Sequence, residues 1–193
     1  MASGTCWHIR SSFFHRGSKC IIDSDSAINL LERQAAVDCT RFFSEYRVIV
    51  TEQAIEETSI GQLTAGCVFE RHALDDDKLE LYERINDSIM ELGPGERSAI
   101  AHALFMSNDG GDERIIIISD DKKARHTFER TMVRMESIVE RFPHLDRITW
   151  VRSFEVLKRT MDKGLLDETS ASGFSLSPVF TEDCQSFFFI ILF

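Results

Sequence analysis

Residues 114–125, RIIIISDDKKAR, decide the fold of this chain. Four consecutive isoleucines are too apolar and too β-branched for a solvated strand, and the run is too short for a free-standing helix. They predict a strand that is buried on both faces, and such strands belong to parallel α/β sheets. Helical spacing begins directly after Asp120 and Asp121. These two carboxylates are therefore expected at the carboxyl end of a strand, where open α/β sheets form their sites.

Two earlier segments repeat this arrangement of a strand followed by acids. Residues 19–25, KCIIDSD, form a short apolar run that ends in acids and leads into a helical pattern. Residues 46–58, YRVIVTEQAIEET, alternate as a strand and continue into a helix that carries Glu56 and Glu57. Strands that alternate with helices predict a three-layer α/β/α sandwich around a central, mainly parallel sheet.

A fourth acid is expected to point inward from a buried helix. Residues 96–106 carry the apolar stripe of that helix, and the Gly-Pro-Gly turn at residues 93–95 is typical of a helix start. Glu96 lies three and four residues before Ala99 and Ile100, which belong to the stripe. Its carboxylate is therefore expected to face the sheet.

The compact unit is predicted to span residues 18–166. Residues 1–17 are interpreted as an N-terminal extension, and residues 167–193 as a loop followed by an apolar tail. The seven-residue apolar run at 187–193 cannot cross a bilayer, which takes about 20 helical residues, so no membrane partner is expected. The five cysteines include no C-x-x-C pair, so they favour reduced thiols in a cytoplasm over a disulfide framework or a zinc site.

The formal net charge of −10 argues against a protein that coats nucleic acid through its charge. The charge does not exclude a nuclease, because metal ions bound in an acidic pocket reverse the local field that a substrate meets.

Acidic side chains from four segments should meet at the carboxyl edge of the predicted sheet. They are Asp23, Glu56 or Glu57, Glu96, and Asp120 or Asp121. Like charges packed together are unfavourable unless a cation joins them. Because the cluster holds only oxygen ligands, with no histidine or cysteine group, Mg²⁺ or Mn²⁺ is the expected cation. Phosphodiester hydrolysis needs a hard metal of this kind with open positions.

The order of four segments resembles the PIN domain, in the branch of predicted nucleic-acid-binding proteins and VapC-type toxins. The segments are CIIDSDSAINLL, VIVTEQAIEET, LGPGERSAIAHAL and IIIISDDKKAR, and the resemblance covers residues 19–165. It implies a metal-dependent ribonuclease that cuts RNA, often as the toxin of a toxin–antitoxin pair. An RNA substrate, an antitoxin protein and a homodimer are the partners it suggests.

The resemblance also assigns roles to particular acids. Carried over by position, the catalytic residues are Asp23, Glu57, Glu96 and Asp121, and Asp120 joins these four as a metal ligand. Because the acids at 56–57 and at 120–121 come in pairs, the facing member of each pair stays open. Asp120 is expected to cap the following helix and Asp121 to bind the metal. Asp25 is a candidate for an additional or outer ligand.

Each acid also has a structural interpretation. Asp23 would then be a helix cap, Glu57 a solvated helix residue, and Glu96 a partner of the helix dipole.

Basic and histidine residues near these acids are ambiguous too. Lys122, Lys123 and Arg125 either contact an RNA backbone or form a solvated turn, with nothing in the sequence to favour one. His102 and His126 are expected to be core or surface residues and not ligands.

Two rival functions remain. A haloacid-dehalogenase-like phosphatase would use the D-x-D at residues 23–25, with its first aspartate as a covalent nucleophile, but the residues that follow lack the small Gly/Thr pattern. A non-catalytic PIN-like binding module is the second rival. The presence of all four acids argues against it.

Overall fold

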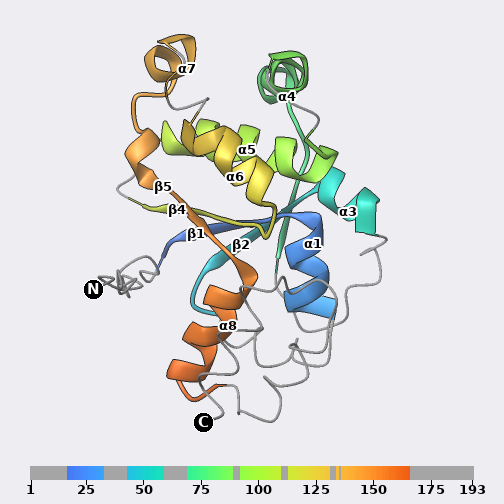
Figure 1. The fold of residues 1–193 in the computed structure, drawn as a ribbon, viewed down its shortest axis with the longest axis vertical. Helices are drawn as coiled ribbons and strands as arrows, with labels where there is room; N and C mark the ends of the chain where they lie inside the picture. Colours follow the sequence, from blue (N-terminus) through green and yellow to red (C-terminus); the bar gives the residue numbers. More distant parts are fainter. Residues whose placement is uncertain are drawn as a thin grey trace, which may run out of the picture.

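A five-stranded parallel sheet in the order β3-β2-β1-β4-β5 forms the centre of the molecule (Figure 1). The computed structural model describes residues 17–32, 43–58, 69–88, 92–109, 113–130, 134 and 136–165. The strands are β1 (Lys19–Ile22), β2 (Arg47–Thr51), β3 (Glu70–His72), β4 (Ile115–Ile118) and β5 (Ile148–Val151). The tail at 167–193 and all of the N-terminal extension except Gly17 lie outside the described residues.

Helices cover both faces of the sheet, so the predicted three-layer sandwich is confirmed (Figure 1). One face carries α1 (Ser24–Ala27), its π-helical continuation η1 (Ile28–Glu32) and α8 (Ser153–Asp162). The other carries α5 (Pro94–Ser107) and α6 (Lys122–Arg130), with α4 (Asp76–Ser88) and α7 (Glu136–Arg141) outside them. The remaining elements are α3 (Glu52–Thr58), beside α5, and the 3-10 turn η4 (Leu145–Arg147) before β5. Among the described helices, none has the length and apolarity to cross a membrane.

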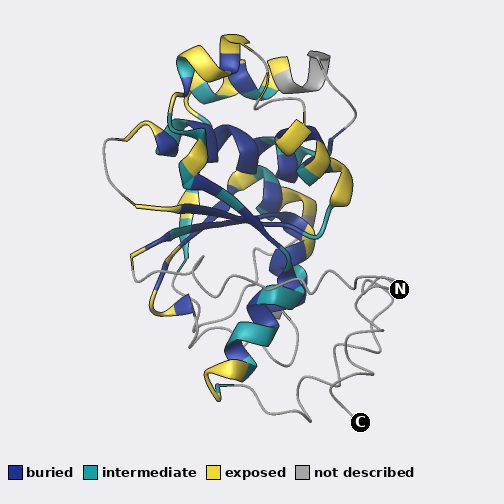
Figure 2. Ribbon diagram, turned by 60° about the vertical axis from the view of Figure 1, so that its left-hand side comes forward, coloured by how far each residue is buried: buried dark blue, intermediate teal, exposed yellow. Residues whose placement is uncertain are grey.

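The isoleucine run forms β4, and all four side chains are buried, as predicted (Figure 2). Because successive strand residues face opposite sides, Ile116 and Ile118 pack in the core beneath α1 and α8. Ile115 and Ile117 pack in the core beneath α5 and α6. A strand in this position has no solvated face, which explains why the run contains no polar residue.

The strand order reverses between β1 and β4. The chain proceeds from β1 outward through β2 and β3, and then returns to add β4 on the opposite side of β1. Ile22 is in register with Ile118, and the amide of Asp23 donates to the Ile118 carbonyl at 3.1 Å. Asp23 therefore lies just outside the sheet at its topological switch point, where open α/β sheets bind their ligands.

Two further features are the edge strand β3 and the end of helix α8. The edge strand β3 was not predicted, because its three residues, ERH, lack an apolar alternation. Helix α8 has its C-cap at Lys163, and the following Gly164 has a φ of +67°, which favours glycine. The Gly164 amide donates to the Met161 carbonyl at 2.7 Å and so helps to close the end of the helix.

Candidate functional site

Asp23 is fully buried, and only one of its two carboxylate oxygens has a hydrogen-bond partner. It is the N-cap of α1, and its Oδ1 accepts the Ser26 amide at 2.8 Å. Its second oxygen, Oδ2, is buried without a hydrogen-bond partner. Burial raises the pKa of Asp23 to about 7 and the nearby charge of Glu96 adds to this, whereas the neighbouring polar groups of Ser119 and Ser26 act in the opposite direction. Asp23 is therefore a helix cap, as its structural interpretation predicted, but capping uses only one of its two oxygens.

Glu96 faces inward, as its place on the apolar stripe predicted. It is the third residue of α5 and its exposed fraction is 8%. Oε2 is buried and has no hydrogen-bond partner. Burial is the main cause that raises its pKa, and the charges of Glu57, Asp121 and Asp25 add to it, whereas a backbone hydrogen bond lowers it. Glu96 therefore carries a second unsatisfied carboxylate oxygen, and its charge is near enough to Asp23 to raise the pKa of Asp23.

Glu57 joins three helices at the same edge. Its Oε2 accepts hydrogen bonds from the Ser24 hydroxyl of α1 and, at 3.0 Å, from the Gly95 amide at the start of α5. Glu56 and Glu57 are both exposed, but of the two it is Glu57 whose side chain takes part in the described hydrogen bonds, so Glu57 is the member of this pair that faces the cluster. A Cβ on Gly95 would lie 2.5 Å from Oε2 of Glu57, which explains the glycine in the Gly-Pro-Gly turn.

The two neighbouring aspartates after β4 serve different helices. Oδ1 of Asp121 accepts the amides of Lys123 at 2.6 Å and Ala124 at 2.9 Å, so Asp121 caps α6. The expectation that Asp120 caps this helix is therefore wrong. Asp120 turns to the opposite side, because successive residues of an extended segment point in opposite directions.

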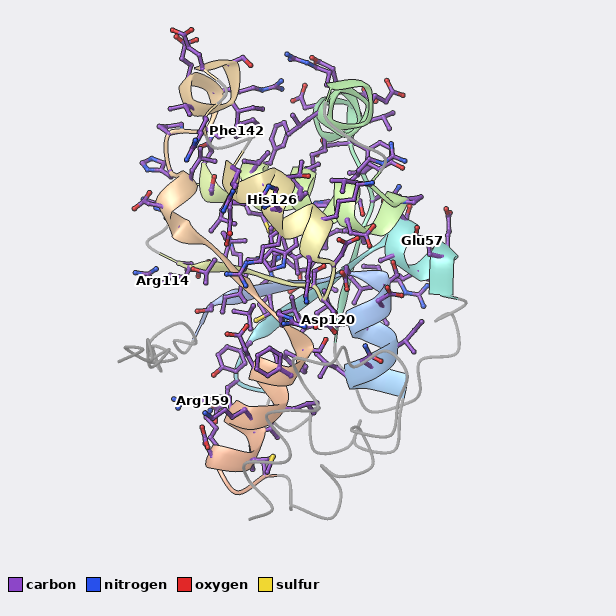
Figure 3. The ribbon with its side chains drawn as sticks, viewed as in Figure 1. Glu57, Arg114, Asp120, His126, Phe142 and Arg159 are labelled. Atoms are coloured by element: carbon purple, nitrogen blue, oxygen red, sulfur yellow. The ribbon has the colours of Figure 1, made fainter. Side chains whose placement is uncertain are left out.

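Asp120 holds the start of α8 (Figure 3). Its Oδ1 accepts the Ser153 amide at 3.0 Å and lies 3.9 Å from Nε of Arg152. Its Oδ2 accepts from Nδ2 of Asn29 at 3.4 Å. Both oxygens of Asp120 therefore have partners in the fold, which makes it a weaker candidate for a metal ligand than Asp23 or Glu96.

The acids form one electrostatic cluster even though several are used as caps. Asp25 is exposed, and its pKa is raised first by partial burial and then by the charges of Glu57, Asp120 and Asp121. Across the described ranges, no three His, Cys, Asp or Glu side chains are grouped closely enough to hold one ion as they stand. The structure therefore brings the predicted residues to one edge, but it does not join all of them into a single ligand set.

The chain matches no family model, no curated protein and no solved structure. An interpretation of the site therefore depends on its geometry.

The two unsatisfied oxygens suit a small hard cation. Mg²⁺ keeps several waters and commonly binds through one or two carboxylates. A buried carboxylate oxygen without a partner is costly, and a cation between Oδ2 of Asp23 and Oε2 of Glu96 would satisfy both. The donors are all oxygens, and His102 and His126 occupy the kinds of position expected for them. His102 is in the core with its ring 5.7 Å from that of His72, and His126 is exposed on α6.

The sequence analysis missed two serines of the site. The Ser24 hydroxyl holds Glu57, and the Ser119 hydroxyl lies beside Asp23 and also accepts the Asp121 amide at 3.2 Å. Their only signal in the sequence is their position next to the acids. Serine in such positions usually indicates a turn or a cap, so the signal is weak.

Proposed function

We propose that this chain is a metal-dependent ribonuclease of the PIN type, which hydrolyses RNA phosphodiester bonds with Mg²⁺ or Mn²⁺. The observation that carries the proposal is the pair of buried, unsatisfied oxygens, Oδ2 of Asp23 and Oε2 of Glu96, at the switch point of a parallel sheet. The order of the four acidic segments in the sequence supports the same assignment.

The acids divide into ligands and positioning residues. Asp23 and Glu96 would hold the ion from beneath, because both are buried and the charge of Glu96 raises the pKa of Asp23. Asp121 and Asp25 are more exposed and would border the opening. When bound, such an ion supplies a water of lowered pKa and neutralises the charge that develops on the phosphodiester.

Glu57 is proposed to act as a positioning residue. Through Ser24 and the Gly95 amide it ties the start of α5, one residue before Glu96, to α1, one residue after Asp23. The two proposed ligands are thus held at a fixed separation by a third carboxylate. Fixed ligands of this kind reduce the reorganisation that metal binding requires.

The phosphatase alternative is less well supported by the geometry. A nucleophilic aspartate must touch the phosphorus atom, whereas the Asp23 side chain has an exposed fraction of 0%. A metal ligand has no such requirement, because it can act from below the surface that the substrate meets. The binding-module alternative differs in its response to metal, since a ligand that binds only the folded state must stabilise it.

The biological setting rests on the resemblance alone. A protein antitoxin, a homodimer and a cytoplasmic location stay predictions. RNA is the proposed substrate, and its sequence preference would depend on the surface around the acids.

Cleavage of a mixed pool of single-stranded RNA tests the proposal. The unaltered chain is expected to cut in Mn²⁺ and to stop in EDTA. Asp23→Asn should abolish cleavage in Mn²⁺, whereas Asp76→Asn, which removes an exposed carboxylate on α4, should leave it unchanged. Cleavage that persists in EDTA, or in Asp23→Asn, would contradict the proposal.

A further inference from the structure

A cleft of about 280 Å³ opens beside the acid cluster, between the start of α6 and the end of β5. Asp120 and Asp121 line it and also belong to the cluster, so the cleft and the candidate metal site share a wall. Most of the other lining residues belong to α6, on which His126 lies (Figure 3). Neither the proposed metal ligands nor the positioning role of Glu57 involves this cleft.

Cationic side chains converge on the cleft in a chain that is otherwise strongly acidic. Lys122, Arg125 and Arg130 come from α6, and Arg152 comes from the end of β5. They face Asp120, Asp121 and Glu129, so the lining carries four positive and three negative side chains, against a formal net charge of −10 for the whole chain. Any neutralisation of the shared aspartates by a cation would leave the cleft strongly positive.

Two of the arginines are held in place by contacts within the fold. Nε of Arg125 donates to Oε1 of Glu129 at 2.9 Å, and a guanidinium has further N–H donors on its terminal nitrogens. Arg152 lies over the Phe154 ring at 5.0 Å, with its Nε 3.9 Å from Asp120. An arginine fixed in this way loses less side-chain entropy when it binds a phosphate, which its planar fork can contact through two hydrogen bonds.

The size of the cleft limits what can enter it. Sites for small ligands begin at about 300 Å³, so the cleft suits one phosphate with part of its nucleotide and is too small for a double helix. Ser119, which interacts with Asp23, and Asp121, whose charge acts on Glu96, both line this space. A strand with its reacting phosphate at the acids would therefore have a neighbouring phosphate within the cleft.

We propose that this cleft binds the phosphate next to the one that is cleaved, in a single-stranded RNA, through Arg125, Arg130 and Arg152. The inference rests on the proposed ribonuclease function. It adds a subsite that positions the strand, and it makes the basic residues of α6 functional and not merely solvated. Phosphate contacts of this kind fix the register of a strand but carry no sequence preference.

The test is the salt dependence of RNA binding, measured by fluorescence anisotropy with a short labelled single-stranded RNA in EDTA, where no cleavage occurs. Removing one arginine that pairs with a phosphate of a single strand should lower the slope of log K against log salt by about 0.7. Arg125→Gln is expected to show this change and, at about 50 mM salt, binding weaker by about eightfold.

Arg84→Gln is the matched control, because Arg84 of α4 also pairs with a glutamate on its own helix four residues away, as Arg125 does. The control should keep both the slope and the affinity of the unaltered chain. An Arg125→Gln slope equal to that of the control, or no measurable RNA binding by the unaltered chain, would overturn the inference.

A second measurement separates this inference from the ribonuclease proposal. RNA substrates in which the phosphate on either side of the cleaved bond is replaced by a neutral methylphosphonate are compared in Mn²⁺. One of the two replacements should raise KM for the unaltered chain and leave KM unchanged for Arg125→Gln. If RNA binds through Arg125 but is never cut, the ribonuclease proposal fails and the cleft is an RNA-phosphate site without a cleavage site beside it. If the RNA is cut but neither replacement changes KM, the subsite proposal is wrong and the ribonuclease proposal is unaffected.

Discussion

The fully buried Asp23 should make the metal-free protein less stable as pH rises, and Asp23→Asn should remove that dependence. Burial raises the pKa of this carboxyl from its ordinary 3.8 to about 7. The folded chain therefore binds the proton more tightly than the unfolded chain, and the stability it contributes is complete below pH 3.8 and lost as pH rises to about 7. For these two pKa values, linkage gives a loss of about 2–3 kcal/mol between about pH 5 and pH 8.

Urea unfolding in EDTA at these two pH values measures the effect. The buried Trp150 of β5 supplies a fluorescence signal from the core. Other groups titrate as well: burial raises the pKa of Glu96 and Asp25, whereas hydrogen bonds from Arg47 and Lys78 lower those of Glu70 and Asp75. Burial also lowers the pKa of His102 from its ordinary 6.5 to about 4, so this group adds stability as pH rises through 6.5 and opposes the effect of Asp23. The informative quantity is therefore the difference between the unaltered chain and the variant.

Mn²⁺ should reverse the penalty at pH 8, because a cation beside Oδ2 favours the ionised form of Asp23. At about a hundred times its dissociation constant, the ion should add about 2.7 kcal/mol to the unfolding free energy. Asp23→Asn should lose most of this gain, and the exposed Asp76→Asn should keep it. If Asp23→Asn shows the same pH dependence as the unaltered chain, the reasoning from burial is refuted.

Three further predictions concern the fold around the acids. Glu57→Ala should cost about 1–3 kcal/mol of unfolding free energy, because it leaves the Ser24 hydroxyl and the Gly95 amide without their acceptor. Glu56→Ala should change the unfolding free energy by no more than about 0.5 kcal/mol, and equal losses for the two variants in urea unfolding would contradict the bridging role of Glu57. Gly95→Ala should keep the circular dichroism of the fold but weaken Mn²⁺ binding, because the added Cβ would displace the Ser24 hydroxyl and the Glu57 carboxylate that join the two proposed ligands. Unchanged Mn²⁺ affinity in calorimetry would argue against it. Ile117→Ala should lower the unfolding free energy by about 2–5 kcal/mol, since the side chain is fully buried in β4. The exposed Val139→Ala should lower it by about 0.5 kcal/mol or less, and an equally small loss for Ile117→Ala would contradict the central position of β4.

The sheet was predictable where the sequence pattern and the burial agree. Four isoleucines in a row have no stable solvated arrangement, so they required the centre of a sheet and both of its covering layers. The inward direction of Glu96 followed from its helical spacing to Ala99 and Ile100. By contrast, β3 is held by its pairing with β2, which its own three residues do not indicate.

The site was predictable in its location but not in its detail. Neighbouring strands that end in acids must bring those acids to one edge, so Asp23 and the pair at 120–121 were expected there. Which oxygens stay unsatisfied depends on contacts between distant segments. Asp120 is occupied by Ser153, 33 residues away, and Glu57 by Gly95, 38 residues away. No local pattern in the sequence encodes such pairs, and the same is true of Arg152 in the cleft.

Calorimetric titration of the metal-free protein with Mn²⁺ tests the central claim most directly, because the claim is that Oδ2 of Asp23 and Oε2 of Glu96 hold a hard cation together. Saturable binding is expected for the unaltered chain, with a severe loss in both Asp23→Asn and Glu96→Gln and no change in Asp76→Asn. Mn²⁺ binding that is equal in all four proteins, or absent from the unaltered chain, would contradict this claim.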